Sequence, residues 1–357
     1  MTDRRKTYMS FSKALSAGVS GATPALEWLV PLLNAEGKDE KLLLDAANVK
    51  RASNIGKAVH LRGLIEFSNF CRKNCHYCGL RADNKKVKRY RLSKETILNT
   101  AIKAEKLGYK TIVLQSGEDL YFSPDVMSNI IKEIKSKTKL AITLSLGERD
   151  EATYLAWKKA GADRYLLRIE TTDPELFKVI HPDSYLEERK NCIYALKKLG
   201  FQLGSGVMVG LPGQDSESLA RDIIWMYEAG VEMIGIGPFI PHEETPLKDK
   251  KRGNIEQTVR LVAVLRLVFP YAHLPATTAM GTIDPLGREK ALKAGANVIM
   301  PNITPVKVKH LYDIYPNKQG IHGGDEIDFA CLKEKIIDLG RTIGTDYGHV
   351  IKKKMLK

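Results

Sequence analysis

Cysteine, acidic residues and long apolar runs are all scarce in this chain of 357 residues, and each shortage excludes a class of protein. The five cysteines are too few for a disulfide-stapled secreted fold of this length. No stretch of eighteen apolar residues occurs, so the sequence predicts no membrane span. The N-terminus, MTDRRKTYMSFSKALSAG, lacks the apolar core of a signal peptide. With 43% apolar residues, the sequence favours a cytoplasmic enzyme with a large core.

The shortage of acidic residues leaves 42 Asp and Glu against 56 Lys and Arg, a formal net charge of +14. Such an excess can attract nucleic acid or an acidic partner protein. Most lysines are scattered, and only residues 84–89 and 352–354 form basic runs, with no aromatic residues interleaved for stacking. We therefore interpret the charge mainly as a solvated surface and expect no nucleic-acid ligand.

The most informative motif is FCRKNCHYCGL, which places Cys71, Cys75 and Cys78 at the spacing C-x3-C-x2-C. Three thiolates can hold three irons of a [4Fe-4S] cluster and leave the fourth iron open, whereas a ferredoxin-type carrier adds a fourth cysteine. A structural zinc site needs four ligands, often as two C-x2-C pairs. Chance clustering of buried cysteines stays open as an alternative. The spacing resembles that of radical S-adenosylmethionine (SAM) enzymes, in which the open iron chelates SAM.

Short apolar strands alternate with amphipathic helices along most of the chain. The predicted strands cover 59–68, 111–117, 140–147, 164–170, 202–212, 233–241, 273–279 and 297–302. The predicted helices cover 93–108, 125–138, 148–161, 185–200, 216–230, 254–269 and 287–295. This alternation predicts an α/β fold with a parallel sheet, closed into a complete (β/α)8 TIM-type barrel. An open doubly wound sheet is the alternative.

Three parts of the chain follow from this pattern. Residues 1–56 are expected to form an N-terminal helical cap, and residues 57–304 the barrel. Residues 305–357 are less regular and are expected to form a C-terminal extension packed on the barrel, with a final helix near 329–340.

Polar residues gather at the carboxyl ends of the predicted strands, which line the active-site mouth of such a barrel. The second strand ends in QSGED, where Ser116 and Gly117 let a ligand approach the backbone, unless this is an ordinary turn that leads to Glu118. Arg168 and Glu170 face the same side of the fourth strand, because side chains alternate. The carboxylate can bind ribose hydroxyls and the arginine a substrate carboxylate, or the two can form an internal ion pair.

Two other strand ends offer weaker signals. Residues 209–214, VGLPGQ, leave room for adenine beside the backbone, although PG is also a common plain turn. Thr277 and Thr278 place two hydroxyls where they can hold a substrate anion, or they simply end a β-rich strand.

From about residue 57 to residue 316 the sequence resembles the HydE family of [FeFe]-hydrogenase maturases. The matching segments include IEFSNFCRKNCHYCGLRADN, TIVLQSGED, AGADRYLLRIET, MVGLPGQ and PATTAMGTI. The resemblance implies one [4Fe-4S] cluster and SAM at the top of a complete barrel, and reductive cleavage of SAM to methionine and a 5′-deoxyadenosyl radical. In this family the radical attacks the sulfur of a cysteine-bearing Fe(CO)2(CN) complex during assembly of the di-iron subcluster.

The resemblance also implies roles for single residues and for partners. The cofactor-binding residues that the resemblance implies in this chain are Tyr77, Gln115, Ser116, Gly117, Glu118, Thr143, Ser145, Glu170, Arg189 and Met208. Its substrate-cavity residues, expected to be catalytic, are Arg168, Thr277, Thr278 and Tyr315. The expected partners are a small-molecule or organometallic substrate, other hydrogenase maturases and a low-potential electron donor.

Two departures from the family pattern bear on function. Ile169 stands where HydE proteins often have His, which removes a polar group from the cavity region. Aligned on YPNK (315–318), two of three C-terminal cysteine positions are Gly320 and Asp328, and only Cys331 remains, so we expect no auxiliary cluster. Two other functions stay open: a HydE-like enzyme acting on another small sulfur-containing or amino-acid-derived substrate, and a non-catalytic iron-sulfur scaffold protein.

Overall fold

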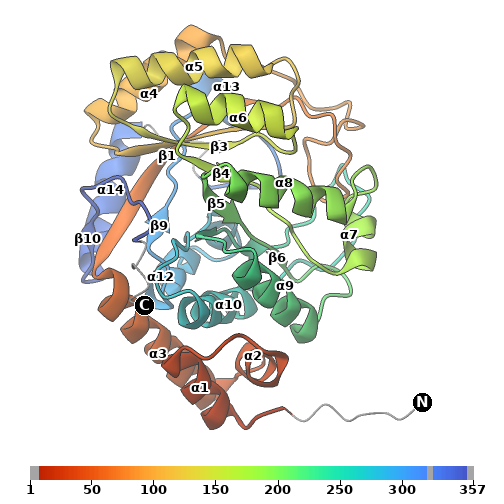
Figure 1. The fold of residues 1–357 in the computed structure, drawn as a ribbon, viewed down its shortest axis with the longest axis vertical. Helices are drawn as coiled ribbons and strands as arrows, with labels where there is room; N and C mark the ends of the chain where they lie inside the picture. The colour runs from red at the N-terminus through yellow and green to blue at the C-terminus, as the bar shows by residue number, and fades with distance from the viewer. Residues whose placement is uncertain (1–7, 320–324, 352–357) are drawn as a thin grey trace.

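The computed structural model describes residues 8–319 and 325–351. Its first three helices are α1 (Phe11–Ser20), α2 (Leu26–Leu33) and α3 (Gly37–Ile55). They gather at one end of the molecule, where α2 packs on α9 (Ser216–Glu228) and α3 packs on α10 (Ile255–Val268) (Figure 1). Within the described ranges, no helix has both the length and the apolarity needed to cross a membrane.

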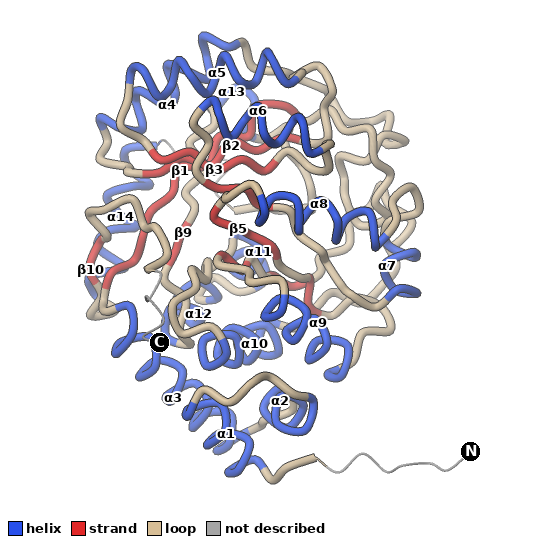
Figure 2. The backbone as a smooth tube through the Cα atoms, viewed as in Figure 1, coloured by secondary structure: helices blue, strands red, loops and turns tan. Residues whose placement is uncertain are grey.

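A parallel sheet runs through the centre of the molecule (Figure 2). Its strands are β1 (Ala58–Ser68), β2 (Thr111–Ser116), β3 (Ala141–Ser145), β4 (Arg164–Leu166), β5 (Gln202–Ser205), β7 (Met233–Ile234), β9 (Val298–Ile299) and β10 (Thr342–Ile343). Seven of them pair in the order β10-β1-β2-β3-β4-β5-β7, and β9 pairs with β1. Parallel neighbours joined by helices confirm the predicted α/β fold.

Regular strand pairing does not close this sheet into the complete barrel that was predicted. Residues 273–279, expected to be the seventh strand, make only single parallel bridges, from His273 to Met233 and from Pro275 to Val298. Proline has no amide hydrogen and cannot sustain a ladder of hydrogen bonds. The last two residues of this segment belong to helix α11 (Thr278–Ile283) instead.

Two other predicted strands are interrupted. The segment 202–212 splits into β5 and β6 (Met208–Val209), and the segment 233–241 splits into β7 and β8 (Gly237–Pro238). The break lies at Gly206, where a Cβ atom would be 1.7 Å from the Gly235 carbonyl oxygen. This close backbone approach ends the regular pairing, and β6 and β8 pair with each other in a separate two-stranded sheet.

Helices cover the outer face of the sheet. Besides α9 and α10, the predicted helices are observed as α4 (Lys94–Lys106), α5 (Pro124–Lys137), α6 (Glu151–Ala160), α8 (Leu186–Lys198) and α12 (Gly287–Lys293). Many begin with a polar cap; for example, the side chains of Ser93, Asp150 and Asn254 each accept a backbone N–H three residues later. Two short helices, α7 (Pro174–Ile180) and α13 (Val306–Lys309), were not predicted, and α14 (Asp325–Asp338) overlaps the predicted final helix.

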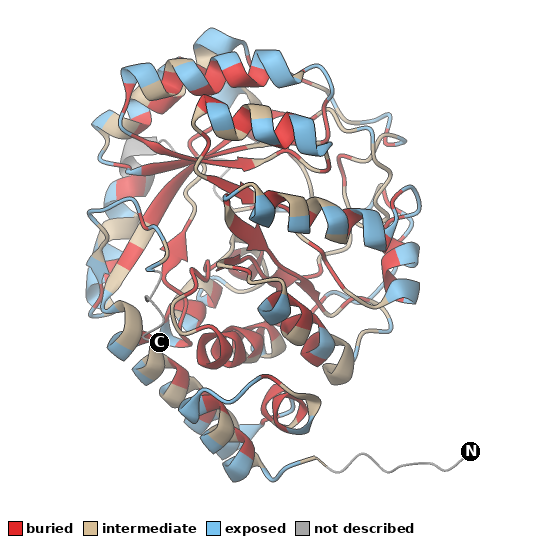
Figure 3. Ribbon diagram, in the orientation of Figure 1, coloured by how far each residue is buried: buried red, intermediate tan, exposed pale blue. Residues whose placement is uncertain are grey.

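The apolar core lies between the sheet and these helices, so that strands and inner helix faces are buried while outer helix faces are exposed (Figure 3). Ile112 and Leu114 of β2 and Ile142 and Leu144 of β3 are fully buried. Side chains alternate along a strand, so the residues between these four point to the other face, the interior of the curved sheet.

The last described residues close the amino end of the sheet. The Arg164 guanidinium donates to the Tyr347 carbonyl oxygen at 2.6 Å, and Arg62 donates to the Gly348 carbonyl oxygen at 3.2 Å. Burial lowers the pKa of Arg164 to about 10. Backbone carbonyls of the C-terminal segment thus satisfy two buried cations at this end.

A third buried arginine gives a test of the packing. Arg266 of α10 is fully buried and donates to the carbonyl oxygens of Phe269, Pro270 and Gly295 and to Asn297 Oδ1. We expect Arg266→Met to lower the free energy of unfolding by about 2–4 kcal/mol, because it leaves buried acceptors unpaired. Urea denaturation measures this loss.

The matched control for this substitution is Arg252→Met, at an exposed position. It should change the free energy of unfolding by less than about 0.5 kcal/mol. Equal stability of the two variants would contradict the structural role of Arg266.

Candidate active site

Polar side chains form a row across the carboxyl ends of β1, β2 and β3. Glu66 is in register with Gln115, and Gln115 is in register with Ser145. Two residues earlier along β2 and β3, Val113 is in register with Thr143. Residues paired across parallel strands point to the same face of a sheet. The strands therefore bring the predicted cofactor residues Gln115, Thr143 and Ser145 onto one interior face.

The three predicted cluster ligands lie on the loop that follows β1. Cys71, Cys75 and Cys78 are free thiols. The Glu118 N–H donates to Cys71 Sγ at 3.4 Å, and Cys75 Sγ lies 3.2 Å from His181 Nδ1. Burial raises the pKa of each thiol, that of Cys78 to about 12. Enclosed thiols with this spacing and an N–H donor suit a site where iron replaces the protons, so the residues fit the three-thiolate side of a [4Fe-4S] cluster.

The loop after β2 lies directly on this cysteine loop. Gly117 N–H donates to the Ser68 carbonyl oxygen at 3.1 Å. A Cβ atom at Gly117 would lie 2.2 Å from the Phe70 carbonyl oxygen and 2.8 Å from Cys71 Cβ, so a larger residue does not fit. The predicted residues Ser116 and Gly117 therefore lie beside the first cysteine, with the Ser116 hydroxyl donating to the Gly117 carbonyl oxygen at 2.6 Å.

The carboxylate of Glu118 holds three loops together. It accepts a hydrogen bond from Arg72 Nε at 3.1 Å and another from the Glu148 N–H at 2.9 Å. These contacts join the cysteine loop to the loops after β2 and β3. Glu118 was predicted to contact the cofactor, and in this structure its carboxylate is engaged within the protein.

Glu148 extends these contacts to α8. Its carboxylate lies 3.0 Å from Lys73 Nζ and 2.6 Å from Arg189 Nε. Burial acts to raise the pKa of Glu148, but Arg189 and Lys73 bring it below its usual range. Arg189, predicted to contact SAM, is buried here and also donates to the Arg168 carbonyl oxygen at 3.2 Å. We call Glu118, Glu148 and their partners Arg72, Lys73 and Arg189 the carboxylate clamp.

Arg168 and Glu170 lie beyond the end of β4, which stops at Leu166 and not at residue 170 as predicted. Arg168 Nη2 lies 2.9 Å from Glu170 Oε2 and donates to the Val207 carbonyl oxygen at 2.7 Å. Glu170 has a φ of 65°, a rare backbone conformation for a residue with a side chain. Burial raises its pKa, although Arg168 and Arg189 oppose the shift. The ion pair considered as the alternative does form, but 30% of the Arg168 side chain stays exposed to a ligand.

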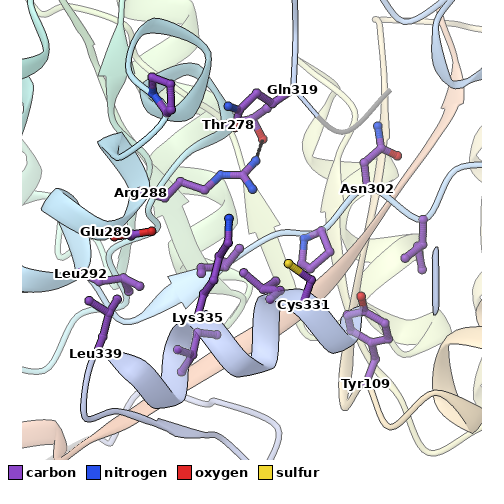
Figure 4. Close-up of a pocket in the computed structure, with 16 residues that line it drawn as sticks. Tyr109, Thr278, Arg288, Glu289, Leu292, Asn302, Gln319, Cys331, Lys335 and Leu339 are labelled. Atoms are coloured by element: carbon purple, nitrogen blue, oxygen red, sulfur yellow. Dashed lines mark hydrogen bonds between the residues drawn. The ribbon is translucent and has the colours of Figure 1, made fainter. Parts of the chain in front are cut away.

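Two buried hydroxyls mark places for a ligand. The Oγ1 atoms of Thr143 and Thr277 have no hydrogen-bond partner within the part of the chain that the structure describes. Buried polar atoms are nearly always paired, so an orphan suggests a group that binds there. Thr277 precedes α11 without capping it, while Thr278 Oγ1 accepts from Arg288 Nη2 at 3.2 Å (Figure 4).

Tyr77 and Met208 supply an apolar wall beside the cysteines. Both belong to a small apolar cluster that also holds Leu176, Ile180, Leu211, Phe239 and Leu247. The Tyr77 ring meets His181 edge-on at 5.4 Å, and burial raises the pKa of the Tyr77 phenol well above its usual value. Such a wall can exclude water from one side of a bound cofactor.

A buried ion pair from the C-terminal segment was missed by the sequence analysis. Glu66 Oε1 lies 2.6 Å from Lys318 Nζ, and Glu66 Oε2 accepts from Asn302 Nδ2 at 2.8 Å. Burial raises the pKa of Glu66, although Lys318 opposes the shift. The usable signal was a glutamate between Ile65 and Phe67, near the carboxyl end of a predicted strand. The predicted residue Tyr315 belongs to the same segment; it is half-buried, and burial raises its pKa.

A cavity of about 300 Å³ lies between α12, α14 and β9 (Figure 4). Thr278 is the only predicted site residue that lines it, and Cys331 faces it from α14. Gly320 lies outside the described residues. Across residues 8–319 and 325–351, no three His, Cys, Asp or Glu side chains converge on a single metal ion. An iron–sulfur cube is larger than one ion and holds its thiolates further apart.

Comparison with known proteins places this site in a family. Residues 65–226 match the model of the radical SAM superfamily. The chain is 51% identical to the [FeFe] hydrogenase maturase subunit HydE of Thermotoga maritima, over 88% of this chain and 90% of that protein. It is 32% identical to the 3-methylornithine synthase of Methanosarcina acetivorans, over 75% of each. The crystal structure of methylornithine synthase (PylB) covers 93% of this chain with a TM-score of 0.80 and 26% identity.

The cysteine spacing, the parallel α/β sheet and the matched superfamily model together define a radical SAM enzyme. Membership of that superfamily implies a [4Fe-4S] cluster and SAM as cofactors. Within it, the chain belongs to the HydE family. The fold is also that of HydG from Carboxydothermus hydrogenoformans, with a TM-score of 0.78 at 20% identity.

The buried Glu66–Lys318 pair can be tested by comparing the free energies of unfolding of single and double variants. Lys318→Met should cost about 3–5 kcal/mol, because it leaves a buried carboxylate without its cation. The double variant Glu66→Gln/Lys318→Met should recover most of that loss, because no buried charge remains. Chemical denaturation of the two variants and the parent measures the coupling.

The control is an exposed pair, Lys198 and Glu151, 3.0 Å apart. Lys198→Met should change the free energy of unfolding by less than about 1 kcal/mol. A double variant at Glu66 and Lys318 that is no more stable than Lys318→Met would show that the two charges are not coupled.

Proposed function

We propose that this protein is a HydE-type maturase that cleaves SAM reductively and directs the 5′-deoxyadenosyl radical to the sulfur of a cysteine-bearing Fe(CO)2(CN) complex. The step belongs to assembly of the [FeFe]-hydrogenase di-iron subcluster, in the cytoplasm and together with other maturases. The identity to the HydE subunit of Thermotoga maritima supports this proposal.

The observation that carries the proposal is the meeting of three features at one end of the sheet. Gly117, which follows β2, lies against Cys71. Glu148 pairs with Lys73 of the cysteine loop and with Arg189, and Arg189 donates to the Arg168 carbonyl oxygen, two residues before Glu170. The interior row at Gln115 and Ser145 ends at the same edge. A cofactor bound at the cysteines would therefore face an enclosed polar interior.

Bound to the three cysteines, a [4Fe-4S] cluster would supply an open iron for SAM and the electron that cleaves it. The protein's own residues hold and orient SAM. Glu170 binds the ribose hydroxyls, and the backbone at Ser116 and Gly117 accepts from the amino group. Thr143 and Ser145 add hydrogen bonds, while the wall at Tyr77 and Met208 excludes water.

The proposed substrate residues adjoin the cofactor residues, because Arg168 pairs with Glu170 at 2.9 Å. Arg168 binds the substrate carboxylate through two parallel hydrogen bonds, and Thr277 contributes its unpartnered hydroxyl. Tyr315 completes this set from the C-terminal segment. Each of these groups favours a small anionic amino-acid derivative.

A second candidate is a HydE-like enzyme that acts on another small sulfur-containing or amino-acid-derived substrate. The 32% identity to a 3-methylornithine synthase supports it. Ile169, which was expected in the cavity region, is instead fully buried in the apolar core. An iron-sulfur scaffold without catalysis is the third candidate, and it would produce no 5′-deoxyadenosine with SAM and dithionite.

We also propose the arrangement of the whole chain. Residues 57–304 form a complete (β/α)8 barrel, with 273–275 in the place of the missing strand. Residues 1–56 cap this barrel, and residues 305–357 extend it, with Lys318 reaching the interior.

Iron content tests the cluster ligands. Anaerobic reconstitution should give about four irons per chain, as expected for one [4Fe-4S] cluster. Cys75→Ala should lose most of that iron and its visible absorption, whereas Cys192→Ala should keep both. About eight irons per chain, or an unchanged cluster in Cys75→Ala, would contradict the assignment.

Binding of a 1,3-thiazolidine carboxylate, a sulfur-bearing substrate mimic, tests Arg168. Arg168→Ala should weaken its binding by about 2–4 kcal/mol, because one partner of a charge pair is removed. SAM affinity should change less, since Arg189 also opposes the rise in the pKa of Glu170 and remains in this variant. Arg221→Ala, at an exposed arginine of α9, is the control. Normal turnover of the mimic by Arg168→Ala would place the substrate elsewhere.

A further inference from the structure

We propose that the surface over the cysteine loop is the docking site for a small acidic one-electron carrier protein. The proposal rests on the proposed function, because reductive cleavage of SAM consumes one electron. In the transfer the carrier loses one electron and the enzyme gains it, and no bond forms or breaks. We call this surface the donor face and define it by Arg72, Lys85, Lys88, Leu120 and Tyr121.

The segment that supplies the basic residues of this face carries a net charge equal to half of the chain's formal net charge. Residues 71–91 contain eight Lys and Arg and one acidic residue, a net of +7 within a total of +14. Five of these cations, Arg72 among them, pair with carboxylates, and across the described ranges Lys85, Lys88 and Arg89 do not. Arg72, Lys85 and Lys88 are exposed. Within the described residues, Lys85 donates only to the Ala82 carbonyl oxygen, so its charge is not neutralised by a carboxylate.

The basic run is fixed beside the cysteines and is not a free tail. Asn84 Nδ2 donates to the Gly79 carbonyl oxygen at 2.7 Å. Arg89 donates to the carbonyl oxygens of Leu80 at 2.9 Å and Arg81 at 2.8 Å. These bonds fold residues 84–89 back onto the end of the cysteine loop. The scattered charge pattern predicted a solvated surface for this run, and these contacts give the run a defined place.

Exposed apolar side chains lie within this positive field. Leu120 is 58% exposed and Tyr121 is 63% exposed. The Arg91 guanidinium lies 3.7 Å from the ring centre of Phe70 and 4.8 Å from that of Tyr121. Phe70 directly precedes Cys71, so this stack connects the exposed tyrosine to the first cysteine. Apolar anchors ringed by charge are characteristic of protein–protein interfaces.

A surface hollow of about 620 Å³ adjoins these anchors and is lined in part by Arg72, Leu120 and Arg149. In the described chain, the Arg149 guanidinium donates to the carbonyl oxygens of Glu148 and Asp119 and pairs with no carboxylate. The hollow therefore adds a further cation to the donor face. Its lining also includes Glu148, which pairs with Lys73, and the carboxylates of Asp150 and Glu188, so among the described lining residues Arg149 stands out as the cation without a carboxylate partner.

The acidic residues on the α8 side of the hollow favour a compact protein partner over a nucleic acid. Exposed Glu187 and Glu188 of α8 lie on that side, and Glu188 lines the hollow. A long polyanion that crosses the face would meet these carboxylates. A small carrier with acidic groups around its redox centre can meet the cations alone, and its on-rate gains from electrostatic steering.

The test uses the reconstituted enzyme and a flavodoxin, a small acidic flavoprotein, as the probe. The variant Lys85→Glu/Lys88→Glu reverses two exposed charges of the donor face. The control Lys106→Glu/Lys110→Glu makes the same change in net charge at two exposed lysines near the start of β2, the opposite end of the sheet. Two readouts are measured: binding of oxidised flavodoxin, and 5′-deoxyadenosine formed with reduced flavodoxin or with dithionite.

We expect the donor-face variant to weaken flavodoxin binding and flavodoxin-driven cleavage at least about tenfold, with a smaller difference at high salt. Its dithionite-driven rate and all properties of the control should match the parent. Equal losses in both variants, or no loss in either, would overturn the docking site. Tight binding of a single-stranded RNA that only the donor-face variant loses, without flavodoxin binding, would assign the face to nucleic acid and overturn it too.

The two proposals fail in different ways. If dithionite yields no 5′-deoxyadenosine with the parent enzyme, the proposed function fails, whatever the binding data show. If dithionite works and the flavodoxin arm shows no charge dependence at Lys85 and Lys88, only the docking site fails.

Discussion

Two buried carboxylates fix the loop on which the whole site depends. Three cysteines can share a cluster only if their backbone is held in place, and the loop between Cys71 and Cys78 has no strand or helix of its own. Glu118 and Glu148 supply the constraint by bonding to side chains or N–H groups of the cysteine loop, the loops after β2 and β3, and α8. Each carboxylate has a cationic partner, which offsets the cost of burying its charge.

The interior next to this loop is built from both ends of the chain. β1 provides Glu66, and the segment after α13 provides Lys318, so the buried Glu66 carboxylate has this cationic partner only when the C-terminal segment lies inside. The amino end of the sheet is closed in a related way, by the carbonyl groups of residues 347 and 348. The result is an interior with polar groups at one end and a sealed base at the other, which suits chemistry that must exclude water.

Local patterns were sufficient to predict most of the fold. Alternating apolar residues located β1, β2 and β3 to within two residues at each end, and two predicted helices begin at Ser93 and Asn254, which the structure shows to be capping residues. The interrupted strands could not be predicted, because the break depends on Gly206 meeting Gly235, two residues of different strands.

The features of the site also divide into those that local motifs predict and those that depend on contacts between distant segments. The cysteine spacing and the QSGED motif are local, and the structure brings the two loops that carry them into contact. The role of Glu118 in the clamp depends on contacts between separate loops, and the partner of Glu66 lies 252 residues away along the chain. Thr277 and Thr278 were predicted on a strand, and a proline-interrupted segment places them at a helix start instead.

The central claim is that three cysteines leave one iron open for SAM, and Mössbauer spectroscopy of the enzyme reconstituted with ⁵⁷Fe tests it most directly. The spectrum is recorded before and after addition of SAM. The account predicts that about one quarter of the iron absorption moves to a distinct site on SAM addition, as expected for one iron of four without a cysteine ligand. A spectrum that SAM leaves unchanged, with all four irons equivalent throughout, would contradict it.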